Sequence, residues 1–177
     1  MKLLMHICCG PCAVYPISVL QDEKVEIEGF FYNPNIHPIE EFNKRKENVE
    51  LLAKNKGFKT IYFDDFLQEN WENFSDSQDE RCKMCYGMRL SKVAKFAHEN
   101  RFDAFSTSLL VSPYQKHDLI KELGEKFAKE YGIEFYYRDF RPGYREGQQM
   151  AKDMELYRQK YCGCIKSLEE RDEKINK

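Results

Sequence analysis

The seven cysteines of this chain fall into three short clusters, and this grouping constrains the fold more than any other feature. The clusters are His6-Ile7-Cys8-Cys9-Gly10-Pro11-Cys12, Cys82-Lys83-Met84-Cys85 and Cys162-Gly163-Cys164, and no cysteine stands outside them. Thiols grouped in this way are typical of metal ligands and redox catalysts. We therefore expect a fold that brings the three clusters together around a metal centre.

The length and charge of the chain set the broad class. A chain of 177 residues is most simply one domain with a single core, and a content of 42% hydrophobic and 33% charged residues is ordinary for a globular protein. The net charge of −2 excludes a globally basic nucleic-acid binder, although it leaves room for a local basic patch.

The cellular compartment bears on what the thiols can do. The first apolar run ends at Ile7, which is too short for a secretory signal, and no run approaches the roughly 20 apolar residues of a membrane-spanning helix. We therefore expect a cytoplasmic protein without a membrane partner. Because a reducing cytoplasm disfavours disulfides and seven thiols cannot all pair, metal binding or thiol redox chemistry is favoured.

Strand-like and helix-like segments alternate along the chain. We expect strands at 2–7, 25–32, 59–63, 103–106 and 134–137, and helices at 12–20, 40–56, 85–97, 119–131 and 147–161. This pattern predicts one α/β domain over residues 1–177, with a mostly parallel five-stranded sheet covered by helices on both faces, Rossmann-like in form. The acidic segment 64–80 is expected to be a loop or flap, and residues 165–177 a frayed charged tail.

Three kinds of chemistry fit the cysteines. Cys9-Gly10-Pro11-Cys12 has the spacing of a thioredoxin-like thiol oxidoreductase, but that activity needs two thiols and leaves five unexplained. Two of the pairs could hold structural zinc, as in a zinc-stabilised RNA-binding domain, although this chain is long enough to fold without zinc. An iron–sulfur cluster takes four cysteines and leaves three for a second metal, so we favour this third hypothesis.

Several motifs occur in order along the chain and point to one family. They are the first cysteine cluster, Arg81-Cys82-x-x-Cys85-x-x-x-Arg89-Leu90, Ser112-Pro113-Tyr114, and Tyr157-Arg158-Gln159-Lys160-Tyr161-Cys162-Gly163-Cys164. The segments 31–38 and 137–143 add to the pattern. Together these motifs resemble the QueH family of epoxyqueuosine reductases from the first strand to Cys164.

The resemblance implies an activity and cofactors. The reaction is reductive removal of the epoxide oxygen of epoxyqueuosine at the wobble position of tRNA, giving queuosine, without cobalamin. The resemblance also implies a fold of the nucleotide-binding superfamily that includes PP-loop enzymes, and a [4Fe-4S] cluster beside an additional mononuclear iron. The metal ligands would be the seven thiols, namely Cys8, Cys9, Cys12, Cys82, Cys85, Cys162 and Cys164.

Some roles follow from this implied chemistry. Because Cys8 and Cys9 are adjacent, we expect them to be divided between the two metals, with His6, Asp79 or Glu80 as candidates to complete the coordination of the iron. The departing oxygen needs a proton donor, for which Tyr114 and Lys116 are the candidates. Basic and aromatic residues bind phosphates and stack on unpaired bases, which predicts substrate binding by Arg138, Arg141, Tyr144, Arg145 and Arg158. Asn33 is added to this set because its loop follows the second strand, at the same edge of the sheet as Cys8. No flavin or nicotinamide motif is visible, so a reduced ferredoxin or flavodoxin is expected to supply the electrons.

Overall fold

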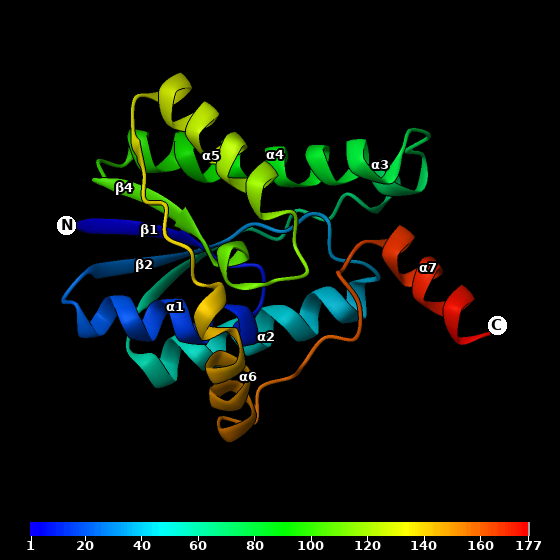
Figure 1. Ribbon diagram of the computed structural model, residues 1–177, viewed down its shortest axis with the longest axis horizontal. Coiled ribbons are helices and arrows are strands. Elements are labelled where there is room, and N and C mark those ends of the chain that lie inside the picture. Colours follow the sequence, from blue (N-terminus) through cyan, green and yellow to red (C-terminus); the bar gives the residue numbers. More distant parts are fainter. Residues whose placement is uncertain (177) are drawn as a thin grey trace.

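The computed structural model describes residues 1–176, and its centre is a five-stranded sheet (Figure 1). The strands are β1 (Lys2–His6), β2 (Glu26–Phe31), β3 (Lys59–Tyr62), β4 (Ala104–Thr107) and β5 (Glu134–Phe135). They lie in the order β3-β2-β1-β4-β5, and every neighbouring pair is parallel. The predicted α/β fold with a parallel five-stranded sheet is therefore confirmed.

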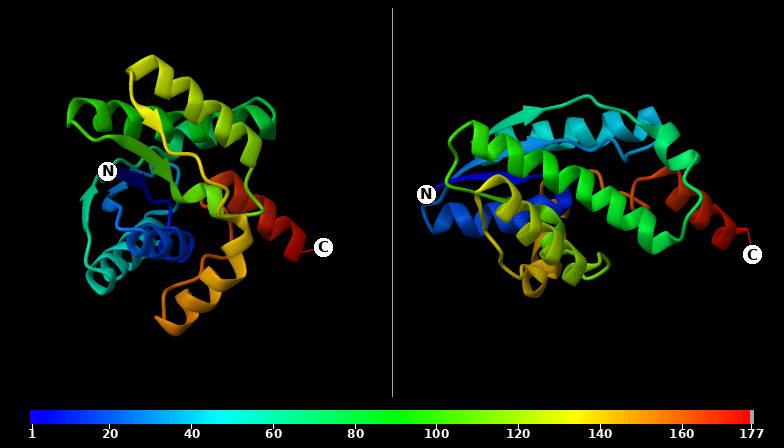
Figure 2. Two further views of the ribbon diagram at one scale, coloured as in Figure 1. Left: turned by 60° about the vertical axis from the view of Figure 1, so that its left-hand side comes forward. Right: turned by 90° about the horizontal axis from the view of Figure 1, so that it is seen from above.

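Helices cover both faces of the sheet, as predicted. One face carries α4 (Gln78–Glu99) and α5 (His117–Tyr131), and the other carries α1 (Gly10–Asp22) and α2 (Ile39–Lys56) (Figures 1 and 2). Helix α6 (Tyr144–Asp153) packs against α1, and α7 (Ile165–Ile175) lies beside the short helix α3 (Gln68–Glu72). No helix of the described residues is both long and apolar enough to cross a membrane.

The topology of the sheet determines where a ligand can bind. Leu3, Leu4 and Met5 of β1 are fully buried, as expected for the central strand of a sheet covered on both faces. The chain moves outward from β1 through β2 and β3, and then returns to place β4 on the other side of β1. Ligands of such sheets bind beyond the carboxyl ends of the strands at this switch point. The first cysteine cluster follows β1 there, and the 3-10 helix η1 (Ser108–Val111) follows β4.

The second cysteine pair lies inside a helix and not at its start. Helix α4 begins at Gln78, seven residues before the predicted start at Cys85, so it includes the end of the expected acidic loop. Its N-cap is Ser77, whose hydroxyl accepts a hydrogen bond from the backbone N–H of Glu80, at the spacing of a capping box. Cys82 and Cys85 therefore lie on one helical face, one turn apart.

Two predictions for the C-terminal part were wrong. The expected helix 147–161 is α6, which ends at Asp153, so the third cysteine cluster follows an irregular segment. The segment expected to fray, 165–177, forms α7 over Ile165–Ile175, and Lys177 lies outside the described residues. Cys164 caps this helix, since its Sγ accepts a hydrogen bond from the backbone N–H of Ser167 at 3.4 Å.

Candidate metal centre

The first cysteine cluster forms a compact group of three thiols at the carboxyl end of β1. The Sγ atoms of Cys8, Cys9 and Cys12 all lie within 4.8 Å of one another, so they could hold one metal ion. Cys9 is the N-cap of α1 and Cys12 lies in its first turn. Ser108 of η1 accepts a hydrogen bond from the backbone N–H of Cys8 and lies 3.2 Å from its Sγ. The division of Cys8 and Cys9 between two metals stays a prediction, and in the structure both thiols lie close to that of Cys12.

A buried network of hydrogen bonds around His6 supports the turn that carries the three thiols. His6 is fully buried, with Nδ1 2.9 Å from the Thr107 hydroxyl and Nε2 3.0 Å from Oδ1 of Asn33. Asn33 also donates to the carbonyl of Ile7 at 2.8 Å. Burial lowers the pKa of His6 to about 4, with the charge of Arg89 acting in the same direction, so the ring is neutral. Both ring nitrogens of His6 are engaged in hydrogen bonds within the protein, which leaves no nitrogen to bind a metal.

The other four thiols form a second group. Cys82 and Cys85 of α4 line a small cavity of about 60 Å³ together with Cys162 and Cys164 of the segment before α7. Trp71 of α3 also lines it and is fully buried. The indole Nε1 of Trp71 is buried and has no acceptor among the described residues. The cavity therefore presents four sulfur atoms and one unused hydrogen-bond donor.

Helix α2 holds the third cysteine cluster in this position. Arg45 donates from Nη1 to the carbonyl of Cys162 and from Nη2 to the carbonyl of Tyr161, each at 2.9 Å. Its Nε is bound to Glu41 at 2.9 Å, and Arg45 is only 3% exposed. This buried pair fixes the loop against the rest of the fold.

Burial works against free thiolates at most of these cysteines. It raises the pKa of Cys82, Cys162 and Cys85, the last to about 12 against the opposing charge of Arg89. In the first group, hydrogen bonds from Cys12 and Cys9 hold the pKa of Cys8 well below its usual range. A bound metal favours the deprotonated form of its thiol ligands, so metal binding would release protons from this centre.

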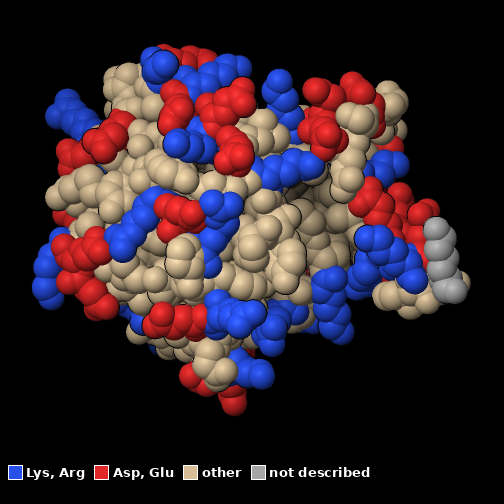
Figure 3. All heavy atoms as spheres, viewed as in Figure 1, with Lys and Arg blue, Asp and Glu red and all other residues tan. Residues whose placement is uncertain are grey.

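An open cleft of about 580 Å³ connects the two thiol groups. Cys12 of the first group and Cys82 and Cys162 of the second all line it. On the face shown in Figure 3 the surface is hollowed next to the C-terminal helix, with Lys and Arg side chains gathered along the lower edge. The remaining wall is mostly polar and aromatic, including Tyr86, Tyr114, Lys116, Tyr144, Gln148, Arg158, Gln159 and Lys160.

The two candidate proton donors lie at the rim of this cleft. Tyr114 is 83% exposed, and its ring centroid lies 5.8 Å from that of Tyr144 in an edge-to-face pair. The ammonium group of Lys116 lies 2.6 Å from Asp79, and this hydrogen bond raises the pKa of Lys116 and lowers that of Asp79. The carboxylate of Asp79 is therefore paired with the ammonium group of Lys116. Neither Asp79 nor Glu80 belongs to the group of three thiols.

The predicted substrate-binding residues divide into two sets. Tyr144 and Arg158 line the cleft. Arg138 is bound to Glu23 and Arg141 to Asp139, each at 2.8 Å, and neither lines the cleft. Two others also lie outside its wall: Arg145, which is exposed, and Asn33, which is fully buried beneath the cysteine turn.

Three residues that lie beside the cysteines were not among the predicted site residues. Gln159 places Nε2 3.0 Å from the Sγ of Cys9, while Trp71 and Arg45 act as described above. Trp71 is the single tryptophan of the chain, and its position in an acidic segment was the one available signal. Gln159 lies in the motif 157–164 that carries the family resemblance, whereas Arg45 has no periodic or compositional signal.

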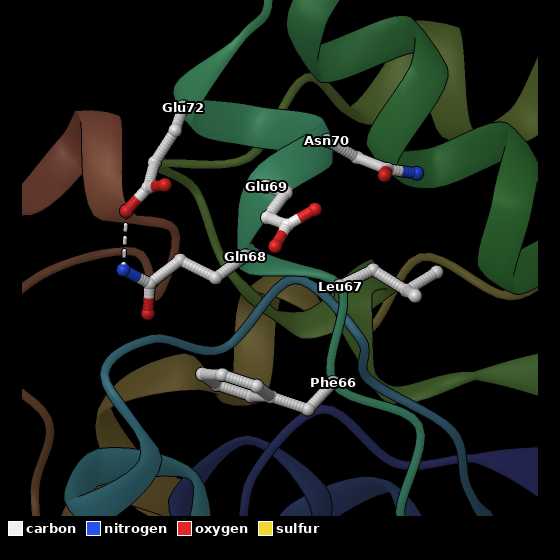
Figure 4. A pocket seen from close by; sticks show the side chains of 6 residues that line it. All are labelled: Phe66, Leu67, Gln68, Glu69, Asn70 and Glu72. Atoms are coloured by element: carbon white, nitrogen blue, oxygen red, sulfur yellow. Dashed lines mark hydrogen bonds between the residues drawn. The ribbon is translucent and has the colours of Figure 1, made fainter.

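A second hollow of about 480 Å³ lies at α3 (Figure 4). Its lining includes Leu67 and two acidic side chains, Glu69 and Glu72, and no cysteine. Gln68 donates to Glu72 one helical turn later at 2.5 Å. An acidic hollow of this kind repels phosphate groups, so the cleft at the thiols is the candidate site.

Comparison with known proteins gives one family and one fold. The family model described as Epoxyqueuosine reductase QueH matches residues 3–170. Epoxyqueuosine reductase QueH of Dehalococcoides mccartyi is 39% identical over 99% of this chain and 97% of its own, and that of Thermotoga maritima is 35% identical over 97% and 93%. A teicoplanin deacetylase complex shares the fold with a TM-score of 0.54 at 8% identity, covering 87% of this chain and 86% of its own.

Proposed function

The chain belongs to the QueH family of epoxyqueuosine reductases, and on this basis we propose that it removes the epoxide oxygen of epoxyqueuosine at the wobble position of tRNA, giving queuosine. The protein is thus an oxidoreductase of queuosine biosynthesis. The reaction consumes two electrons and two protons and releases the oxygen as water. One observation carries the proposal: thiols from three distant segments form two groups that share the wall of one open cleft.

The donor set supports an iron–sulfur cluster and a separate iron. Four cysteines are the usual ligand set of a [4Fe-4S] cluster, and we assign it to Cys82, Cys85, Cys162 and Cys164. The buried Nε1 of Trp71 supports this assignment, because it is a donor without an acceptor and the sulfide of a cluster accepts hydrogen bonds. The other three thiols would hold the mononuclear iron, leaving room for an oxygen ligand.

The side chains of the cleft would orient the reacting group and supply protons. When bound, the cluster supplies single electrons and the iron supplies a Lewis acid for an oxygen leaving group. Gln159 donates toward the thiols of the first group and keeps them at the floor of the cleft. Tyr114 and Lys116 are the proposed proton donors at the rim, with the Lys116 proton shared with Asp79.

The rim supports binding of an anticodon loop. Tyr114 offers an exposed ring and Tyr144 a half-buried ring on which unpaired bases can stack, and Arg158, with neighbouring Lys160, offers cations for phosphate groups. Arg138 and Arg141 already have carboxylate partners, so we expect them to contribute less than Arg145. We retain a reduced ferredoxin or flavodoxin as the proposed electron donor and the cytoplasm as the proposed location.

The test is conversion of the modified tRNA by the metal-loaded protein. The chain is reconstituted anaerobically with iron and sulfide and mixed with tRNA carrying epoxyqueuosine and excess dithionite. Mass analysis of the nucleosides should show queuosine, lighter by one oxygen atom, and Cys8→Ser should abolish it while Met84→Leu, next to Cys85, should not. Colourless protein with stoichiometric zinc after reconstitution would favour the second candidate function, a zinc-stabilised RNA-binding domain.

A further inference from the structure

Three arginines of the described residues are buried, and one of them lacks a carboxylate partner. Arg45, Arg81 and Arg89 are 3%, 8% and 3% exposed. Arg45 is bound to Glu41 and Arg81 to Glu170, each at 2.9 Å. Within residues 1–176, no carboxylate lies within ion-pair distance of Arg89. A guanidinium is always protonated, and a buried charge is retained only where something compensates it.

The contacts of Arg89 indicate what compensates it. Its Nη2 lies 3.1 Å from the Sγ of Cys85, and its Nε donates to the carbonyl of Cys85 at 3.0 Å. Its guanidinium also lies over the ring of Tyr86, 5.6 Å from the centroid. Arg89 follows Cys85 by one helical turn in α4, so the helix itself directs the side chain toward the thiol. The side chain lines the same small cavity as the four thiols of the second group.

We infer that Arg89 is a positioning residue whose counter-charge is the metal-bound thiolate group, and that its fixed positive charge raises the midpoint potential of the redox group held by Cys85. This inference rests on the proposed function, because it requires the cluster. An electron that arrives without a proton adds one negative charge beside a guanidinium that is itself buried. The attraction favours the reduced state, and it is strong because a buried pair is little screened.

The measurement is a potentiometric titration of the reconstituted protein, followed by visible absorbance under anaerobic conditions. Arg89→Gln should lower the midpoint potential, so that the ratio of reduced to oxidised protein at a fixed potential falls at least tenfold. Arg89→Lys keeps the charge and should restore most of the ratio. The double variant Arg81→Gln/Glu170→Gln is the matched control, because it removes a buried arginine from the same cavity without changing the net charge. It should change the ratio less than threefold.

A second measurement needs no variant and so does not depend on whether Arg89→Gln folds. If a fixed arginine compensates the added electron, the midpoint potential of the wild-type protein should not change across neutral pH. A midpoint potential that falls as the pH rises, with the slope expected for uptake of one proton per electron, would overturn the inference. An Arg89→Gln protein with the wild-type potential would also overturn it. Wild-type protein that takes up no dithionite-bleachable cluster would instead overturn the proposed function, and this inference with it.

Discussion

The side-chain Nε2 of Gln159 lies 3.0 Å from the Sγ of Cys9, although 150 residues of sequence separate them. The same nitrogen lies 3.8 Å from the Sγ of Cys12. The contact joins the loop after α6 to the turn after β1, which makes one amide the link between the third cysteine segment and the first thiol group. Donors of this kind orient metal ligands and stabilise their negative charge.

Replacing Gln159 should therefore weaken metal binding at the first thiol group. Gln159→Leu keeps the size of the side chain and removes the donor, so iron should be lost to a chelator at roughly tenfold lower chelator concentration than in the wild type. Gln148→Leu is the control, because Gln148 lines the same cleft and, among the described residues, no hydrogen bond joins it to a thiol. Iron bound per chain is measured after anaerobic reconstitution and chelator challenge. Equal retention in the two variants would show that the amide plays no part in metal binding.

Breaking the buried pair of Arg45 and Glu41 should destabilise the fold. Arg45→Met leaves Glu41 charged and poorly solvated and frees the carbonyls of Tyr161 and Cys162, which should lower the free energy of unfolding by about 3–5 kcal/mol. In the double variant Glu41→Gln/Arg45→Met no unpaired charge remains, so part of that loss should be recovered. Urea unfolding of the metal-free proteins measures both. A double variant less stable than Arg45→Met would contradict the role assigned to the pair.

The sequence was sufficient for the sheet because its central strand is apolar and strands alternate with helices along the chain. Buried strands such as β1 have few alternatives, and the alternation of strands with helices allows little besides parallel pairing. Helix α7 gave no such signal, since none of its residues is buried. It is held by the Cys164 cap and by Glu170, which binds Arg81 from another helix. Interactions over such separations are not visible in a local pattern.

The site was predictable as a set of residue types and not as a geometry. All seven thiols were expected to meet, and each lines the cleft, lines the small cavity or belongs to the group of three. The division between the groups depends on Arg45, which fixes Cys162 opposite α4. The structural role of Asn33 was missed for a similar reason. Asn33 is buried under the first cysteine cluster, where it donates a hydrogen bond to the carbonyl of Ile7 and so supports that turn.

Arginines of the C-terminal half should differ in their contribution to tRNA binding. Arg158→Gln removes an exposed cation from the cleft wall, so the affinity for tRNA should fall and the dependence of log Kd on log salt should become shallower by about 1. Arg138→Gln is the control, because Arg138 is already paired with Glu23 and lies outside the cleft. Filter binding at several salt concentrations measures the slopes. Equal slopes in the two variants would remove Arg158 from the binding site.

The stability of the fold should fall on mild acidification, in part through His37. Its Nδ1 accepts a hydrogen bond from the backbone N–H of Ile165 and Nε2 lies 2.8 Å from the carbonyl of Pro34, so the folded ring is neutral. Burial lowers the pKa of His37 below the 6.5 of an unfolded chain. Unfolded protein then binds more protons below that value, and the free energy of unfolding decreases as the pH falls through it.

Variants at two histidines isolate this contribution. The free energy of unfolding is measured with urea at about pH 7.5 and about pH 5.5 for the wild type, His37→Gln and His98→Gln. The decrease between the two values should be smaller in His37→Gln, which has lost the shifted group. His98 is exposed on α4, and its variant should keep the full decrease. A His37→Gln protein with the wild-type pH dependence would rule out His37 as its source.

The conformation of Gly163 should make it intolerant of a side chain. Its φ is +141°, and an added Cβ would lie 2.8 Å from Nη1 of Arg45, the atom that binds the carbonyl of Cys162. Gly163→Ala should therefore lower the free energy of unfolding by about 1–3 kcal/mol and reduce the iron bound per chain. Gly87 lies within α4 with nothing near an added Cβ, so Gly87→Ala should stabilise the protein by about 0.4–1 kcal/mol. Thermal unfolding and iron content are measured on both variants; a Gly163→Ala protein that matches Gly87→Ala in both would show that the loop before Cys164 adapts freely.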